Sequence, residues 1–276
     1  MIFHNKTIII TGASAGIGKE LAIALANQSA NLVLAARNQA AIDEVASICL
    51  QNGGKAIAVP TDVTNPEDCR KLIETTKNTF GAIDVLVNNA GISMYALFEE
   101  VEDLSLFEQL MKVNYLGAVY CTHYALPDLK ASQGLIVAIS SLTGKMGIPT
   151  RSGYSASKHA MQGFFDSIRI ELRDKKVDVL VVCPGFVATD MRQRVLGTDG
   201  NAISTSLGDE QSMAMPVSEC VNQIIQAMQA RKRELIMTPK GRFGMWLKLI
   251  APNFVDMMSA RAVHSQKRSY SNRQGG

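Results

Sequence analysis

The feature that most constrains the fold is a glycine-rich turn near the N-terminus, between a short apolar run and an amphipathic helical pattern. Residues 7–11 (TIIIT) are β-branched and apolar, which predicts a buried strand. The turn TGASAGIG follows, with apolar positions at Ile17, Leu21 and Leu25 on one face of a helix. Such a strand, turn and helix N-terminus can bind a pyrophosphate through backbone N–H groups. The GxxxGxG spacing differs from the common GxGxxG, and a purely structural turn is the alternative interpretation.

Strand and helix patterns alternate along the rest of the chain, with short links between them. This alternation predicts an α/β fold of the Rossmann type, in which a doubly wound parallel sheet has helices on both faces. We expect a single domain over residues 1–240. The expected strands are 7–11, 32–36, 56–60, 85–88, 135–139, 178–182 and 234–238, and the later helices are 39–51, 66–80, 104–130, about 153–174 and 218–230.

Composition excludes several classes of protein. The chain has 276 residues, 47% of them hydrophobic and 19% charged, which suits one globular domain. Its net charge of +3 is small and its basic residues are scattered, so we expect no nucleic-acid partner. Five cysteines without a CxxC spacing predict free, mostly buried thiols. The four histidines form no cluster, so we expect no metal site. With neither a signal peptide nor a transmembrane run, the sequence predicts a cytoplasmic protein.

Two pairs of residues suggest chemistry or cofactor choice. Tyr154 and Lys158 (YSASK) stand four apart in a predicted helix, so they share one face. A neighbouring ammonium favours a phenolate, and we expect it to lower the pKa of Tyr154 from its usual ~10. An ordinary surface helix is the alternative interpretation. At the end of the second strand, Ala36 stands where an acidic residue would bind a ribose 2′-OH, and Arg37 follows. A guanidinium suits a 2′-phosphate, which favours NADP(H) over NAD, although a solvated arginine is the alternative.

Two further polar residues allow two interpretations each. Asn114 stands inside the predicted helix 104–130, although asparagine is a mediocre helix former. It has either a specific role or a place on an exposed turn. Asp62 follows the strand 56–60 and either accepts a hydrogen bond from an adenine amino group or occupies an ordinary turn.

Taken together, these motifs resemble the short-chain dehydrogenases/reductases over roughly residues 5–240. Ser141 precedes Tyr154 by 13 positions and Asn114 precedes it by 40, as in that family. Ala15 departs from the pattern, because many NADP-preferring members have a basic residue in the glycine turn; the NADP prediction therefore depends mostly on Arg37. The matching residues are Thr11-Gly12, Gly16-Ile17-Gly18, Asp62, Asn88-Asn89-Ala90-Gly91, Asn114, Ser141, Tyr154 with Lys158, and Pro184-Gly185 with Thr189.

The resemblance implies a seven-stranded sheet, a nicotinamide cofactor and a homodimer or homotetramer. It also implies a catalytic set of Asn114, Ser141, Tyr154 and Lys158. Tyr154 would be the acid in reduction and the base in oxidation, Ser141 would donate to the carbonyl oxygen, and Lys158 would bind the nicotinamide ribose. Asn114 would hold a water that links Lys158 to solvent. The expected cofactor-binding residues are Gly12, Ser14, Gly16, Ile17, Gly18, Arg37, Asp62, Val63, Asn89, Ala90, Gly91, Tyr154, Lys158, Pro184, Gly185, Val187 and Thr189.

Residues 241–262 extend beyond the family core as an apolar helical segment that Pro252 divides in two. Three roles are open for this segment: an arm packed on the core or on a partner subunit, an entrance for a lipophilic substrate, or an interfacial helix on a membrane. We expect residues 263–276 to form a flexible tail and residues 190–216 a mobile lid with a short helix. The apolar residues on one face of the extension are Phe243, Trp246, Leu247, Ile250, Phe254, Met257 and Met258.

The leading hypothesis is an NADP(H)-dependent oxidoreductase for an apolar alcohol or ketone. A catalytically silent dinucleotide sensor or scaffold is a second hypothesis, and a peripheral membrane protein that associates with lipid is a third. The presence of Ser141, Tyr154 and Lys158 together favours the enzyme. The residues expected to line the substrate site are Ser93, Met94, Leu142, Met146, Phe186 and the lid 190–216.

Overall fold

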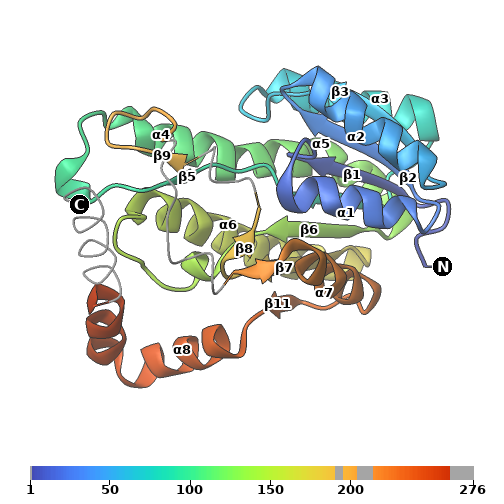
Figure 1. The fold of residues 1–276 in the computed structure, drawn as a ribbon. Coiled ribbons are helices and arrows are strands. Elements are labelled where there is room, and N and C mark those ends of the chain that lie inside the picture. Colours follow the sequence, from blue (N-terminus) through green and yellow to red (C-terminus); the bar gives the residue numbers. More distant parts are fainter. Residues whose placement is uncertain (1, 190–194, 204–213, 262–276) are drawn as a thin grey trace.

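The fold is that of a computed structural model of the chain, which describes residues 2–189, 195–203 and 214–261 (Figure 1). Its centre is a seven-stranded sheet in the order β11-β7-β6-β4-β1-β2-β3, with every neighbouring pair parallel. The predicted doubly wound Rossmann-like sheet is therefore confirmed. The strand order reverses between β1 and β4, and ligands of such sheets bind at the carboxyl ends of the strands at this point. The strands are β1 (Thr7–Thr11), β2 (Asn31–Ala36), β3 (Lys55–Pro60), β4 (Val85–Asn88), β6 (Leu135–Ile139), β7 (Asp178–Cys183) and β11 (Glu234–Ile236).

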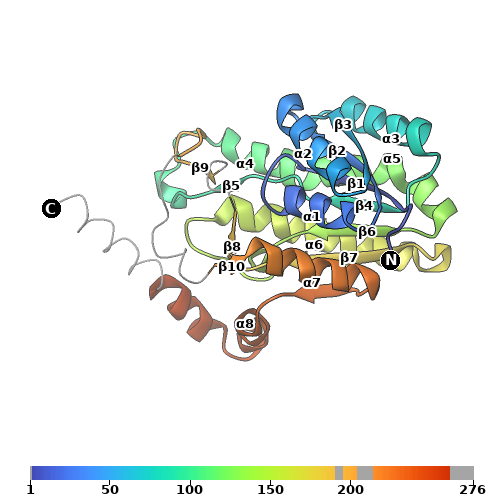
Figure 2. The ribbon, with the colours of Figure 1, turned by 45° about the vertical axis from the view of Figure 1, so that its right-hand side comes forward.

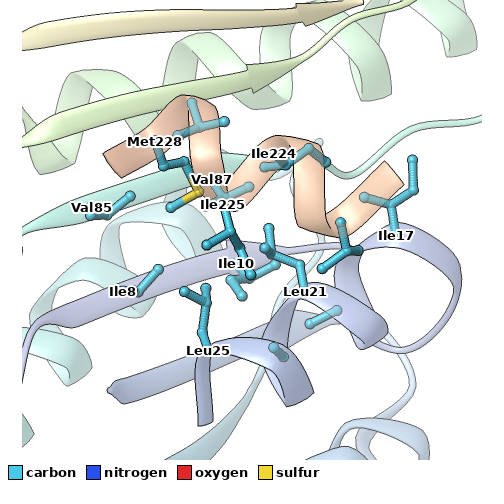
Figure 3. Close-up of a cluster of buried hydrophobic side chains, with 14 of the residues drawn as sticks. Ile8, Ile10, Ile17, Leu21, Leu25, Val85, Val87, Ile224, Ile225 and Met228 are labelled. Carbon is cyan, nitrogen blue, oxygen red and sulfur yellow. The ribbon is translucent and has the colours of Figure 1, made fainter. Parts of the chain in front are cut away.

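Helices cover both faces of the sheet, and each face has its own apolar core. Side chains alternate between the faces along each strand, so Ile8 and Ile10 lie in one core while Ile9 lies in the other. Figure 3 shows Ile8 and Ile10 packed with Leu21 of α1 and Ile224 of α7. The first face carries α1 (Gly16–Ala26), α2 (Gln39–Gln51) and α7 (Val217–Gln229), and the second carries α3 (Pro66–Phe80), α5 (Gly117–Ser132) and α6 (Ser152–Glu171).

The predicted helix 104–130 is not one regular α-helix. It consists of α4 (Ser105–Met111), a π-helical turn at Lys112–Leu116 and α5, which continues to Ser132. Asn114 occupies the middle of the π-helical turn. A π turn holds one residue more than an α turn and frequently marks a functional site. An asparagine in mid-helix was a signal of this irregularity, but the hydrophobic pattern did not indicate the extra residue.

Two short parallel strand pairs lie apart from the main sheet. Strand β5 (Ser93–Met94) pairs with β9 (Val195–Leu196), and β8 (Val187–Ala188) pairs with β10 (Met215–Pro216). These pairs anchor both described ends of the segment expected to form a lid. Residues 190–194 and 204–213 of that segment lie outside the described residues, and its described parts, 195–203 and 214–216, contain no helix.

The C-terminal extension is helical, with a break near the predicted position. Helix α8 (Pro239–Ile250) begins with a Thr238 cap, and a further helical stretch covers residues 252–261. Figure 1 shows α8 beyond β11, and both views show α8 outside the two helical layers (Figures 1 and 2). The expected tail 263–276 lies outside the described residues. Within the described part of the chain, none of the helices is both long and apolar enough to span a membrane.

Candidate active site

Helix α6 places Tyr154 and Lys158 at the same cavity, one helical turn apart. The Nζ atom of Lys158 lies 5.8 Å from the centroid of the Tyr154 ring. Lys158 is buried, and its ammonium donates a hydrogen bond of 2.8 Å to the carbonyl oxygen of Ile139 at the end of β6. This bond holds the ammonium at the tip of the side chain against the end of β6, so its charge stays beside the tyrosine.

Ser141 reaches the same cavity from the loop that follows β6. Its backbone is extended, and its Oγ caps the 3₁₀ helix Leu142–Gly144 by accepting a 3.2 Å hydrogen bond from the N–H of Thr143. Ser141 also lies near Tyr154, since it lowers the pKa of Tyr154 in part, and both side chains line the cavity. The two side chains therefore line one cavity, where a carbonyl oxygen could contact both hydroxyls.

Asn114 is fully buried, so the interpretation of an exposed turn is wrong. Its Oδ1 accepts a 2.8 Å hydrogen bond from the N–H of Ile92, and its Nδ2 donates to the Ile92 oxygen at 2.9 Å and to Ser157 Oγ at 2.9 Å. The π-helical turn aims the amide at the loop after β4. A Cβ on Gly91 would lie 3.2 Å from Asn114 Oδ1 and 3.7 Å from Lys158 Nζ, so the glycine lets these two groups approach each other.

Burial has the largest effect on the pKa values of Tyr154 and Lys158, the two residues on α6. Burial raises the pKa of Tyr154 above its usual value, while the hydrogen bond with Ser141 and the positive charge of Arg151 lower it in part. Our expectation of a lowered pKa for Tyr154 is therefore wrong. Burial also lowers the pKa of Lys158 to about 8, and the nearby Cys183 opposes this shift. Taking an ammonium out of water disfavours its charged form, which explains the direction for Lys158.

The glycine turn after β1 is locked to the loop after β4. Asn89 Nδ2 donates to the carbonyl oxygens of Thr11 (2.9 Å) and Gly12 (3.2 Å). Thr11 Oγ1 in turn accepts from the N–H groups of Asn89 (2.9 Å) and Ala90 (3.0 Å). A Cβ on Gly12 would lie 2.8 Å from Ala90 Cα, and Gly12 has a φ of +65°. Only glycine fits this close, left-handed position without strain.

The N-terminus of α1 is open where the turn meets it. Its N-cap, Ala15, makes no side-chain cap hydrogen bond, and the first turn contains no acidic residue. Helices α2 and α3 differ, because Asn38 and Asn65 accept hydrogen bonds from their first N–H groups. Open N–H groups and the positive end of the helix dipole suit a phosphate. The chain therefore fits a dinucleotide at this point.

The adenosine end of the expected cofactor site lies at the edge of β2 and β3. Arg37 follows β2 and is exposed. Asp62 Oδ1 accepts from both the N–H (2.9 Å) and the hydroxyl (2.8 Å) of Thr64, which is the geometry of a turn. Val63 packs closely on Gly117, where a Cβ would lie 2.8 Å from Val63 Cγ2.

The cavity collects residues from both halves of the chain. Three of the expected substrate residues line it, namely Ser93, Leu142 and Phe186. Met94 is instead fully buried in a separate apolar cluster, and Met146 does not reach the cavity. The expected cofactor residues that line the cavity are Ile17, Asn89, Gly91, Tyr154, Lys158, Pro184, Gly185, Val187 and Thr189.

Arg151 also lines the cavity, and its role was not predicted from the sequence. This buried arginine donates a 3.0 Å hydrogen bond to Ser93 Oγ. Its guanidinium carbon lies 5.8 Å from the ring centroid of Tyr95 and 5.9 Å from that of Phe186. Its position three residues before Tyr154, on the same face of the helix start, was the available signal.

Comparison with known proteins decides the family. The sequence pattern of the family described as short chain dehydrogenase matches residues 6–199. The chain belongs to the short-chain dehydrogenase/reductase family. A Dictyostelium discoideum protein named dehydrogenase/reductase SDR family protein 7-like is 36% identical over 95% of this chain and 83% of its own length. The 11-beta-hydroxysteroid dehydrogenase A of Arachis hypogaea is 37% identical over 91% of this chain and 74% of its own length.

Two solved structures have a similar fold. A short chain dehydrogenase/reductase from Burkholderia phymatum in complex with NAD has a TM-score of 0.82 and 23% identity, over 92% of this chain and 96% of its own. An alcohol dehydrogenase from Thermococcus sibiricus, complexed with 5-hydroxy-NADP, has a TM-score of 0.71 and 25% identity, over 84% and 94% of the two chains. The chain is therefore an oxidoreductase of this family that uses a nicotinamide dinucleotide. Among the residues described, no group of three His, Cys, Asp or Glu side chains could hold a metal ion.

Proposed function

We propose that the protein is an NADP(H)-dependent oxidoreductase that interconverts a carbonyl and a secondary alcohol on an apolar substrate. One observation carries this proposal: Ser141, Tyr154 and Lys158 line a single cavity together with Asn89 and Thr189. Thr189 lies beside the glycine turn, since a Cβ on Gly16 would be 3.3 Å from Thr189 Cβ. The acid/base groups thus face the place where the fold can hold a nicotinamide.

The chain's own residues supply the proton chemistry. In reduction, the Tyr154 hydroxyl donates a proton to the carbonyl oxygen, and in oxidation its oxygen takes the proton back. Ser141 donates a hydrogen bond to the same oxygen, which stabilises the charge that develops there. The raised pKa of Tyr154 keeps the phenol protonated at neutral pH, the form that reduction requires. A bound nicotinamide supplies or accepts the hydride.

Lys158 and Asn114 support the tyrosine from the side of the expected cofactor. Lys158 places positive charge beside the phenol and has donors left for a ribose hydroxyl, because its bond to Ile139 uses one of three N–H groups. The Asn114 amide lies close to Lys158 across Gly91. We assign Asn114 the task of ordering a water between Lys158 and solvent.

The choice of NADP(H) over NAD rests on Arg37. This side chain is exposed at the end of β2, next to Ala36, where a carboxylate would repel a 2′-phosphate. The remaining cofactor contacts would come from Ser14 and the other residues of the glycine turn, from Asp62 and Val63 near the adenine, and from residues 184–189 near the nicotinamide.

An apolar substrate is supported by the lining of the cavity, where Ile92, Ile148 and Val195 join Leu142 and Phe186. Steroid ketones are reasonable first probes, given the names of several relatives.

The test is a screen for NADPH oxidation with steroid, retinoid, fatty-acyl and small aromatic ketones, with NADH in parallel. Wild-type protein should prefer NADPH. Arg37→Ala should lose about tenfold or more of that preference, the effect of one charged hydrogen bond, and Arg37→Lys should lose less. A wild-type preference for NADH would overturn the assignment of Arg37. Tight NADPH binding without turnover of any ketone would favour the silent sensor or scaffold.

We also propose that residues 242–261 contact a membrane surface. Trp246 is 67% exposed, Leu249 77% and Ile250 81%, although large apolar side chains usually avoid water. Phe243, Phe254 and Met258 extend this surface, and the exposed Arg242 and Arg261 flank it. Apolar side chains with basic neighbours suit the interface of an anionic bilayer. Five free, buried cysteines support a reducing, cytoplasmic location for the rest of the protein.

Co-sedimentation with anionic phospholipid vesicles tests this proposal in the full chain. The double variant Trp246→Glu/Ile250→Glu should lose vesicle binding. Ile170→Glu is the matched control, because Ile170 is equally apolar and 76% exposed on α6. If the double variant instead binds vesicles as wild type does but dissociates a homodimer or homotetramer in gel filtration, the surface is an interface between subunits.

A further inference from the structure

The first turns of α8 pack directly on the loop that follows Ser141. Leu142 lines the cavity, and its side chain lies against Gly241 of α8. A Cβ on Gly241 would lie 2.7 Å from Leu142 Cδ2 and 2.8 Å from Leu142 Cδ1, which is closer than real Cβ contacts allow. On its other side, Leu142 Cδ1 is 3.5 Å from the Cβ position of Gly185. The missing side chain at position 241 therefore provides the space that Leu142 occupies.

The contact continues along one face of α8. Residues 241, 244 and 248 are three and four positions apart, so they lie on the same side of the helix. A Cβ on Gly244 would lie 3.4 Å from Met146 Cε, an ordinary contact, and Lys248 Nζ donates to the carbonyl oxygen of Lys145 at 3.4 Å. The helix thus follows the loop 142–146 closely, and the tightest point is at Gly241.

The loop backbone has little freedom to retreat from α8. The N–H of Leu142 donates to the carbonyl oxygen of Pro184 at 2.9 Å. Lys145 Nζ forms a 2.5 Å ion pair with Glu234 Oε1 of β11, and both side chains are largely buried. A group added at position 241 would therefore move the flexible end of the Leu142 side chain, whose open side is the cavity.

We propose that Gly241 is a specificity-determining residue, which sets the width of the substrate cavity by letting Leu142 lie back against α8. This inference rests on the proposed function, because it assigns a role within the same cavity. A side chain at position 241 turns Leu142 into the cavity and excludes bulky substrates, while small ones still fit. The extension beyond the family core is then the outer support of the substrate site.

Steady-state kinetics of Gly241→Ala with two ketones test the proposal. The probes are cyclohexanone and the fused-ring 1-decalone, with NADPH as reductant. We expect kcat/KM for decalone to fall about tenfold or more, the scale on which a hydrophobic pocket discriminates by one or two carbons. The value for cyclohexanone and the KM for NADPH should change much less. Gly244→Ala, one turn along the same helix, is the matched control and should leave the ratio of the two ketones unchanged.

A double-mutant cycle with Leu142→Ala separates this mechanism from damage to the start of α8. A Cβ at position 241 would also lie 2.8 Å from Thr238 Oγ1, which caps the helix by accepting from the N–H of Gly241. If Leu142 transmits the effect, Gly241→Ala should cost nothing further in the Leu142→Ala background. The same loss in both backgrounds would overturn the proposal.

A measurement without turnover keeps this inference separate from the proposed function. In protein labelled with ¹³C at leucine methyl groups, the Leu142 signals are identified by their loss in Leu142→Ala. They should shift in Gly241→Ala and stay in place in Gly244→Ala. If wild type reduces neither ketone but the signals shift, the proposed substrates fail while the Gly241 contact stands. If the Leu142 signals do not move in Gly241→Ala, the inference is overturned whatever the kinetics.

Discussion

The two walls of the cavity are built in different ways. On the cofactor side, main-chain groups meet each other or a short amide side chain, as where Asn89 Nδ2 bridges the oxygens of Thr11 and Gly12. On the substrate side, the end of a long side chain makes the contact, as where Leu142 lies against Gly241 of α8. The first wall is fixed by the backbone, whereas the second is fixed by packing. The chemistry is therefore held rigidly on one side, while the size of the substrate site can change on the other.

The largest effect should come from the group that faces both walls. Tyr154→Phe removes one hydroxyl and leaves the ring that packs beside Lys158. Turnover should fall by about 10²–10⁴-fold, the usual contribution of a positioned acid or base, while the dissociation constant for NADPH stays close to the wild-type value. Stopped-flow reduction and fluorescence titration measure the two quantities. Turnover at the wild-type rate would refute the role of Tyr154.

A smaller effect concerns the buried charge of Lys158. The pKa of Lys158 is lowered from 10.5 to about 8 in the folded protein. Between these values the unfolded chain binds the proton and the folded protein does not, so the free energy of unfolding rises with pH. Relative to Lys158→Met, the wild type should gain about 3 kcal/mol as pH rises from about 8 to about 10.5. Urea unfolding at several pH values measures this difference, and parallel curves for the two proteins would contradict it.

The smallest expected effect is on the free energy of unfolding, when one glycine from each wall is replaced by alanine. A Cβ on Gly18 would lie 2.5 Å from the Gly12 oxygen and 2.6 Å from Asn89 Nδ2, two groups that are fixed by hydrogen bonds. Gly18→Ala should therefore lower the free energy of unfolding by about 1–3 kcal/mol, the usual cost of overpacking. Gly241→Ala should cost less, because the end of Leu142 can move. Gly163→Ala, with nothing near its Cβ position on α6, is the control. Equal losses at positions 18 and 241 would remove the distinction between the walls.

The sequence predicted the backbone of the fold well, because strand, helix and glycine patterns report on backbone geometry. Alternating strand and helix patterns predicted all seven strands of the sheet. Spacing placed Tyr154 and Lys158 on one helix face, the resemblance to the family added Ser141, and all three line one cavity. Glycine spacing reports directly on backbone geometry, because a Cβ cannot fit at Gly12 or Gly18.

The substrate side was predicted less well, because side-chain packing leaves no periodic signal. Met94 and Met146 looked like lining residues, yet Met94 is buried elsewhere and its Sδ accepts from the N–H of Gly153. The position of Arg151 at the cavity was not predicted, because a basic residue at a helix start has many ordinary explanations. The direction of the Tyr154 pKa was also mistaken, because spacing reports a nearby charge but not the depth of burial that outweighs it.

The π-helical turn at Lys112–Leu116 has a consequence for how this protein tolerates change. Each residue of an α-helix advances the chain by about 100° around the axis. Deleting one residue from the turn would make α4 and α5 one regular helix and rotate Leu106 and Leu110 away from the apolar cluster that they fill. It would also carry Asn114 off Ile92. The number of residues in this segment must therefore stay the same. Functional variants should show many substitutions here and almost no insertions or deletions.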